Sequence, residues 1–246
     1  MGIYIMDETL TQTRSRTRSH AAPLRAKVST PALIHGDTMN ADEFLRRYEV
    51  VDEDTKAELL DGVVYMFNEF LSTQWHAAPD GLLQTWMGYY AIETPGVQTC
   101  PNATIYFGPK DVLQPDGILR LAPEMGGRSV IDKKGMLEGP IEFVAEIGAS
   151  SAAFDVGEKR EAYLKSGVSE YLAWDTKKSA IHWWHNDHGD YVPFDPDANG
   201  IIRSRAFPGL WLDTGALLKR DGKALMAALK KGLRSAEHKR FVRRAG

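Results

Sequence analysis

Two carboxylates in the middle of the chain have the types and spacing for metal-assisted chemistry on a phosphate. Asp116 follows Pro115 in an apolar segment, and thirty residues later Glu146 lies near the end of the apolar stretch Glu142–Gly148. A carboxylate buried in such a strand costs several kcal/mol unless it is paired or holds a metal ion. We therefore predict that Asp116 and Glu146 bind a divalent metal ion.

The ligand types indicate which metal and which reaction. Oxygen ligands favour Mg²⁺ or Mn²⁺ over Zn²⁺. A metal held by two carboxylates activates water and neutralises charge on a transferring phosphate. Lys159 falls in the first turn of the helix predicted after Glu146, from where its flexible side chain can reach back to the strand end and assist. Hydrolysis of a phosphodiester is the reaction that these residues predict.

The elements that position these residues follow from hydrophobic periodicity and turn signals. Short β-rich segments alternate with amphipathic helices, which predicts an α/β (α+β) fold with a mixed central sheet flanked by helices. Strands are predicted at Ala57–Leu60, Val63–Phe67, Val97–Phe107, Val112–Leu121, Ile141–Ile147, Ser169–Trp174, Ala180–Trp184 and Tyr191–Phe194. Helices are predicted at Met39–Val51, Trp75–Glu93, Asp155–Gly167 with Asp155 and Glu158 as a capping box, and Asp213–Phe241.

Length and composition favour one domain with extensions. The 246 residues are 43% hydrophobic, enough for a full core. We expect a flexible arm over residues 1–37, the folded domain over 38–218 and a basic helical extension over 219–246. No apolar run approaches the ~20 residues of a membrane-spanning helix, and no secretory signal is evident, so we expect a cytoplasmic protein. Cys100 is the only cysteine, which excludes an internal disulfide and a cysteine-based zinc site.

A nucleic-acid partner would need a local basic surface, because the net charge of the chain is −3. One candidate is the N-terminal arginine run, and the other is the C-terminal segment. That segment either contacts nucleic acid or is the solvated face of an amphipathic helix. Its basic residues are Lys219, Arg220, Lys223, Lys230, Lys231, Arg234, Lys239, Arg240, Arg243 and Arg244.

Five motifs together resemble the Uma family of restriction-endonuclease-like proteins, over about Met39 to Leu217. Each motif is loose, but their order and spacing are specific. They are Glu58–Tyr65 (ELLDGVVY), Gln114–Asp116 (QPD), Val144–Ile147 (VAEI), Asp155 followed by Lys159 and Tyr163, and Gly167–Tyr171 (GVSEY).

The resemblance implies the PD-(D/E)xK nuclease fold, with Asp116 and Glu146 as metal ligands. Glu58 matches an additional acid of the family, and His76 matches a histidine that contacts phosphate or orders the site. Tyr163, in the same motif as Lys159, is a further candidate for substrate binding. The usual lysine two residues beyond the second acid is replaced here by Gly148, so the resemblance implies that Lys159 supplies the cation.

Each of these residues also has a structural interpretation. Asp116 could form a turn before Gly117, Glu58 could be an exposed hairpin residue paired with Lys56, and Lys159 could be solvated. His76 and Tyr163 could be packing residues.

The leading hypothesis is a Mg²⁺- or Mn²⁺-dependent DNA endonuclease, which the resemblance implies to be a homodimer. The alternative is a nucleic-acid-binding or assembly module on the same fold with weak or no activity. Metal dependence separates the two, because a binding module would hold DNA equally well in chelator.

Overall fold

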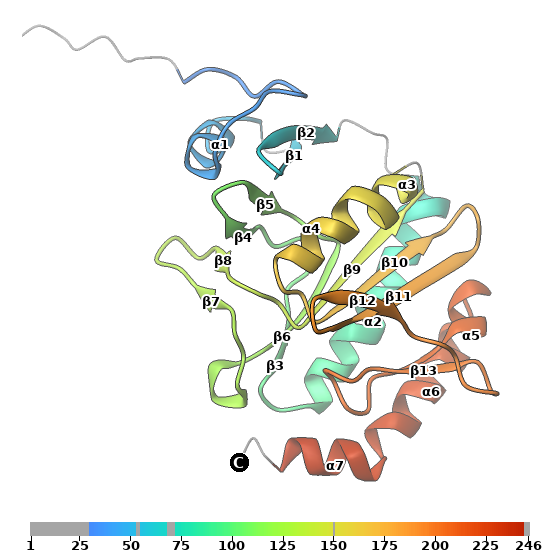
Figure 1. The fold of residues 1–246 in the computed structure, drawn as a ribbon. Helices are drawn as coiled ribbons and strands as arrows, with labels where there is room; N and C mark the ends of the chain where they lie inside the picture. The colour runs from blue at the N-terminus through green and yellow to red at the C-terminus, as the bar shows by residue number, and fades with distance from the viewer. Residues whose placement is uncertain (1–29, 53–54, 68–71, 150, 244–246) are drawn as a thin grey trace, which may run out of the picture. The chain divides into compact units, whose positions relative to one another are not determined.

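Two six-stranded β-sheets and the helices that cover them form the fold (Figure 1). The computed structural model describes residues 30–52, 55–67, 72–149 and 151–243. Pro31–Gly246 is one compact unit, and most of the predicted N-terminal arm, residues 1–29, lies outside the described residues. Within the described ranges, no helix is long and apolar enough to cross a membrane. The predicted fold class, mixed β-structure flanked by helices, is confirmed, with two sheets in place of one.

The first sheet contains the hairpin predicted around Asp61–Gly62. Asp61 and Gly62 have φ angles of 48° and 80°, as a two-residue turn of this kind requires. In spatial order, the strands are β2 (Val63–Phe67), β1 (Lys56–Leu60), β5 (Asp111–Leu113), β4 (Ile105–Gly108), β8 (Leu137–Glu138) and β7 (Val130–Ile131).

The second sheet contains one parallel pair, β9 and β10, among antiparallel neighbours. Both strands are buried along their whole length, as is usual where helices cover both faces of a sheet. In spatial order, the strands are β12 (Asp190–Pro193), β11 (Ala180–Asp187), β10 (Glu170–Asp175), β9 (Phe143–Gly148), β6 (Gly117–Leu121) and β3 (Val97–Thr99).

Helices pack on opposite faces of the second sheet because successive strand side chains alternate between the faces. Phe143 of β9 packs with Trp86 of α2 (Ala78–Glu93) in one core. Val144 lies in a different core with Tyr163 of α4 (Arg160–Lys165). The crossover from β9 to β10 runs through α3 (Ala152–Phe154), the π-helical turn η3 (Asp155–Lys159) and α4.

The C-terminal helices belong to the core that contains α2. Leu225 and Leu229 of α6 are fully buried in it, and α6 also packs against β14. The remaining elements are α1 (Ala41–Tyr48), η1 (Thr73–Ala77), η2 (Pro123–Met125), the ribbon β13 (Ile201–Arg203) and β14 (Trp211–Asp213), α5 (Thr214–Leu218), α6 (Gly222–Leu233) and α7 (Ala236–Val242).

Two predicted strands are wrong because the chain changes sheet within each. Val97–Phe107 divides into β3 and β4 around Asn102, which has a φ of 55°. Val112–Leu121 divides into β5 and β6 around Pro115, which has no N–H to donate to a ladder. The chain therefore passes between the two sheets just before Asp116.

Two predicted helices also have wrong boundaries. The helix after β9 begins at Ala152, so Asp155 lies inside it and is not its cap. The predicted helix Asp213–Phe241 is three helices, because Asp213, Asp221 and Ser235 each accept a hydrogen bond from a backbone N–H and start a new one. The ribbon of β13 and β14 was not predicted.

Candidate active site

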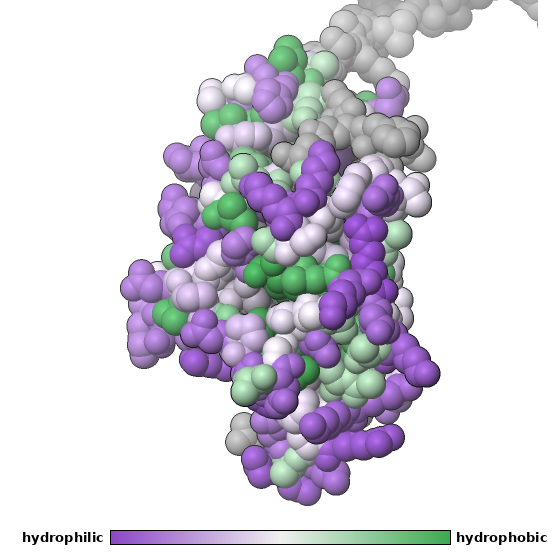
Figure 2. Space-filling model, turned by 90° about the vertical axis from the view of Figure 1, so that its right-hand side faces the viewer, coloured by the Kyte–Doolittle hydropathy of each residue, from purple (hydrophilic) through white to green (hydrophobic). Residues whose placement is uncertain are grey.

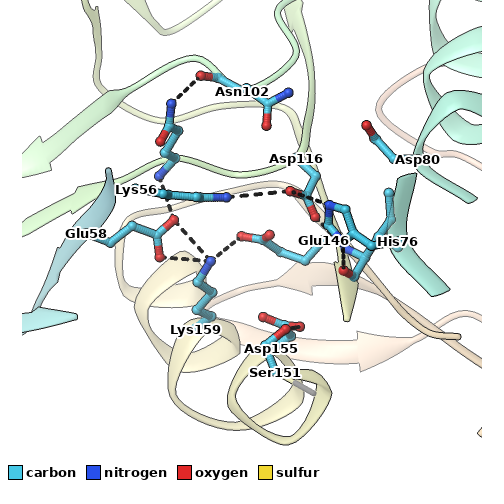
Figure 3. A network of polar contacts seen from close by, with 12 residues as sticks. Lys56, Glu58, His76, Asp80, Asn102, Asp116, Glu146, Ser151, Asp155 and Lys159 are labelled. Atoms are coloured by element: carbon cyan, nitrogen blue, oxygen red, sulfur yellow. Dashed lines mark hydrogen bonds and ion pairs between the residues drawn. The ribbon is translucent and has the colours of Figure 1, made fainter. Parts of the chain in front are cut away.

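Strand register brings the two predicted metal ligands together. Gly117 of β6 pairs with Ala145 of β9, so the next antiparallel position places Asp116 beside Glu146. The Asp116 Oδ2 atom accepts a hydrogen bond of 2.8 Å from the backbone N–H of Ile147. This bond fixes the carboxylate at the edge of β9, and its Oδ1 atom points into the cluster shown in Figure 3.

Glu146, Lys159 and Glu58 form a buried ion cluster. The Lys159 Nζ atom lies 2.8 Å from Glu146 Oε1, 2.9 Å from Glu58 Oε2 and 3.1 Å from Glu58 Oε1. The Glu58 Oε1 atom also accepts a 2.9 Å bond from the backbone N–H of Gln114. Glu58 is fully buried, which rules out the interpretation of an exposed hairpin glutamate. The three side chains join β1, β9 and the crossover helix at one point.

The crossover helix presents its residues at a spacing of four. Asp155, Lys159 and Tyr163 are therefore on one face, and all three are buried against the sheet. The Tyr163 hydroxyl donates a 2.6 Å hydrogen bond to Glu146 Oε1. This places Tyr163 as a support for Glu146, and its contact with a substrate stays a prediction.

His76 lies at the edge of the site, on the η1 turn. Its Nδ1 atom donates to the Ile147 carbonyl at 2.9 Å, and its Nε2 atom lies 3.8 Å from Asp116 Oδ1. The imidazole is 20% exposed. His76 therefore both ties η1 to the end of β9 and faces Oδ1 of the buried Asp116 carboxylate.

Sequence reasoning missed Lys56 as a member of the site. Lys56 is two residues before Glu58 on β1, so both side chains are on the same face of the strand. Its Nζ atom lies 3.6 Å from Asp116 Oδ1, and its side chain is 32% exposed. The spacing of Lys56 and Glu58 was the available signal, but it does not reveal that the Lys56 side chain lies close to Asp116.

Charge in the cluster is unbalanced. Three carboxylates, those of Glu58, Asp116 and Glu146, share two lysines, Lys56 and Lys159, while burial and the charge of Glu146 raise the pKa of the fourth carboxyl group, Asp155, to about 8. Burial, with the neighbouring charge of Glu146, raises the pKa of Asp116. Burial also raises the pKa of Glu146, but Lys159 and Lys56 outweigh it and hold that pKa below its usual value. The excess of negative charge is the kind that a divalent cation would neutralise.

The free carboxylate oxygens fit such a cation. Lys159 and Tyr163 both donate to Oε1 of Glu146, so Glu146 Oε2 and Asp116 Oδ1 accept no hydrogen bond from the residues that the structure describes. No three histidine, cysteine or acidic side chains within the described ranges are arranged to hold a metal ion. Magnesium is commonly held by only one or two carboxylates, with water and substrate oxygens completing its shell. The donor set therefore suits Mg²⁺ or Mn²⁺.

Gly148 explains why the cation comes from the helix. A Cβ atom at this position would lie 2.5 Å from Asp155 Oδ2 and 2.6 Å from the Cα of Ala152. No side chain fits there while the crossover helix packs so closely. Lys159 instead reaches the two glutamates from the next turn of the helix, on the same face as Asp155.

Comparisons with known proteins agree with the residue pattern. A family model, Uma2, described as "Putative restriction endonuclease", matches residues 41–215. No curated protein matches. A solved structure of a "putative nuclease belonging to DUF820" from Anabaena variabilis ATCC 29413 is similar, with a TM-score of 0.57 and 15% sequence identity. The similarity covers 74% of this chain and 98% of that chain, and at this identity it shows a shared fold.

We predict that Gly148→Ala lowers the free energy of unfolding by about 1–3 kcal/mol, because the new methyl group overlaps Asp155 and Ala152. Gly157→Ala is the matched control, since a Cβ atom there meets nothing within 4 Å. Urea denaturation measures both. Equal effects of the two substitutions would show that the close approach at Gly148 does not constrain the helix.

We also predict that stability falls as pH rises towards 8. Burial and the charge of Glu146 raise the pKa of Asp155 to about 8, against about 4 in the unfolded chain. Between these values the folded protein keeps a proton that the unfolded chain loses, so raising the pH favours unfolding by at most about 1.4 kcal/mol per unit. Asp155→Asn should reduce this slope in urea denaturation at pH 5, 6 and 7 in chelator. Parallel slopes for both proteins would contradict the prediction.

Proposed function

Since this chain belongs to the Uma2 family of restriction-endonuclease-like proteins, we propose that it is a metal-dependent nuclease that hydrolyses phosphodiester bonds in DNA. One observation carries the proposal. Asp116 and Glu146, on adjoining strands, each present an oxygen without a hydrogen bond from the described residues, beside an excess of buried negative charge. Such a pair is the minimum that a phosphodiesterase metal site needs.

The proposed roles follow from the contacts. Asp116 and Glu146 hold the metal ion, which when bound would activate water and neutralise charge on the phosphate. Lys159 and Tyr163 fix Glu146 through its other oxygen, and Lys159 is the buried cation of the site. His76 stands where a phosphate oxygen could approach Asp116. Two such sites in a dimer can cut both strands of a duplex together, so we propose a homodimer as the active form.

A basic surface next to the site supports DNA as the substrate. The basic residues at the start of the C-terminal helices, Lys219, Arg220 and Lys223, are exposed, although the chain as a whole is slightly acidic. In Figure 2, hydrophilic side chains predominate over the lower part of the face, at the height of α6 and α7. The Arg220 guanidinium lies 5.6 Å from the ring centre of Trp75, the residue before His76. The α5–α6 turn thus carries positive charge to the edge of the site.

The direct test is nicking of supercoiled plasmid and degradation of single-stranded DNA with Mg²⁺, Mn²⁺ or chelator. The wild-type protein should cleave only with metal. Asp116→Asn and Glu146→Gln should each lower the rate at least about 100-fold, because each removes a charge that holds the metal. Glu138→Gln, which changes an exposed glutamate of β8, is the control and should cleave normally.

Two results would overturn the assignment. Cleavage that persists in chelator would exclude a metal-dependent reaction. Absence of cleavage in all conditions, with DNA binding unchanged in both variants, would favour the binding-module function.

We predict that the double substitution Lys219→Glu and Arg220→Glu weakens DNA binding. Each phosphate contact that is lost should lower the slope of log Kd against log salt concentration by about one. Fluorescence anisotropy in chelator measures this without cleavage. Lys239→Glu with Arg240→Glu, on α7 at the other end of the C-terminal helices, changes charge equally and should leave the slope unchanged. Equal losses of DNA affinity for both pairs would indicate that overall charge attracts the DNA, with no defined path for it along the protein surface.

A further inference from the structure

The buried lysine of the site is enclosed by carboxylate oxygens. The Lys159 Nζ atom donates hydrogen bonds to Glu58 Oε1 at 3.1 Å and to Glu146 Oε1 at 2.8 Å. A third carboxylate oxygen, Glu58 Oε2, lies 2.9 Å from Nζ as an ion pair. The Lys159 side chain is 3% exposed, and the rings of Phe67 and Phe154 lie 5.5 and 6.0 Å away. To reach a phosphate, Lys159 would have to leave two carboxylates buried without a counterion, which is strongly unfavourable.

Lys56 has the opposite properties. Its Nζ atom lies 3.6 Å from Asp116 Oδ1, beyond the length of a normal hydrogen bond, and donates no hydrogen bond to any residue that the structure describes. Its N–H donors face other oxygens without competition from the described residues. The base of the side chain is fixed, because Lys56 pairs with Phe67 on β2.

Lys56 also lies on the open side of the site. Asp116, Glu146, Glu58 and Lys159 are all buried, whereas Lys56 is 32% exposed. In Figure 3, Lys56 extends towards Asp116 from the side opposite His76. Lys56 and His76 thus flank Asp116 Oδ1, at 3.6 and 3.8 Å.

We propose that Lys56 is the catalytic lysine that contacts the scissile phosphate, and that Lys159 is a positioning residue that holds Glu58 and Glu146. This rests on the proposed nuclease function. In the reaction, water oxygen forms a bond to phosphorus, the bond from phosphorus to the leaving sugar oxygen breaks, and a proton from the water passes to the leaving oxygen. The Lys56 ammonium stabilises the negative charge on the non-bridging oxygens during this displacement. It neither gains nor loses a proton overall.

The test uses Lys56→Met and Lys56→Arg in the full chain. Lys110→Met is the matched control, because Lys110 also lies 3.6 Å from an aspartate, Asp61, but at a remote turn of the same sheet. Single-turnover cleavage by Lys56→Met should be slower by about 10²–10³-fold. Lys56→Arg should recover part of the rate, because it retains the positive charge. Lys110→Met should cleave at the wild-type rate.

A second readout separates catalysis from structure. The affinity for Mn²⁺, measured by calorimetry without DNA, should be equal or tighter in Lys56→Met, because the substitution removes a positive charge next to the carboxylates. A merely structural role would lower Mn²⁺ affinity and cleavage together, and that result would overturn the proposal. Cleavage by Lys56→Met at the wild-type rate would overturn it while the nuclease function stood. Absence of cleavage by the wild-type protein would refute both.

Discussion

The site depends on the ion cluster of Lys159 with Glu58 and Glu146. Its members come from three elements: β1 of the first sheet, β9 of the second sheet and the crossover helix. Losing any one of them would leave an uncompensated charge in a buried environment. The cluster is therefore more than a local contact, because it holds one strand of each sheet and a helix at a fixed separation. Asp116 lies at the point where the chain passes from the first sheet to the second. The ion cluster therefore also fixes the position of Asp116.

Burial within the site increases from the open side to the helix. Lys56 and His76 are partly exposed, whereas Asp116, Glu146 and Lys159 are almost completely covered. The charged groups that hold the site together are thus buried, and the groups available to contact a ligand are the partly exposed ones. Asp116 is the intermediate case. Its Oδ2 atom is held by the backbone, while Oδ1 faces both partly exposed side chains. Burial, and then the neighbouring charge of Glu146, raises the pKa of this carboxyl.

The sequence shows the acids of the site better than their neighbours. A carboxylate in an apolar strand is conspicuous, so Asp116 and Glu146 could be identified from pattern alone. Lys56 could not be identified in this way, because its role depends on which part of the chain lies beside β1. Asp155 was misassigned as a cap because Asp155 and Glu158 have the spacing of a capping box, whereas the helix begins three residues earlier. The division of two predicted strands was also invisible, since both parts of each are apolar and the change of sheet is a tertiary event.

The position of Lys159 depends on the absence of a side chain at Gly148. The helix can start at Ala152 and pack against the end of β9 only because position 148 has no side chain. That close packing in turn brings Lys159 within 2.8 Å of Glu146 and leaves its stem buried. A lysine at position 148 would displace Asp155 and Ala152 and so move Lys159 away from both glutamates. The strand lysine of the usual pattern and the helix lysine of this chain therefore exclude each other sterically. In this chain the buried cation, Lys159, comes from the helix. The more exposed side of Asp116 is therefore next to a different cation, Lys56 of β1.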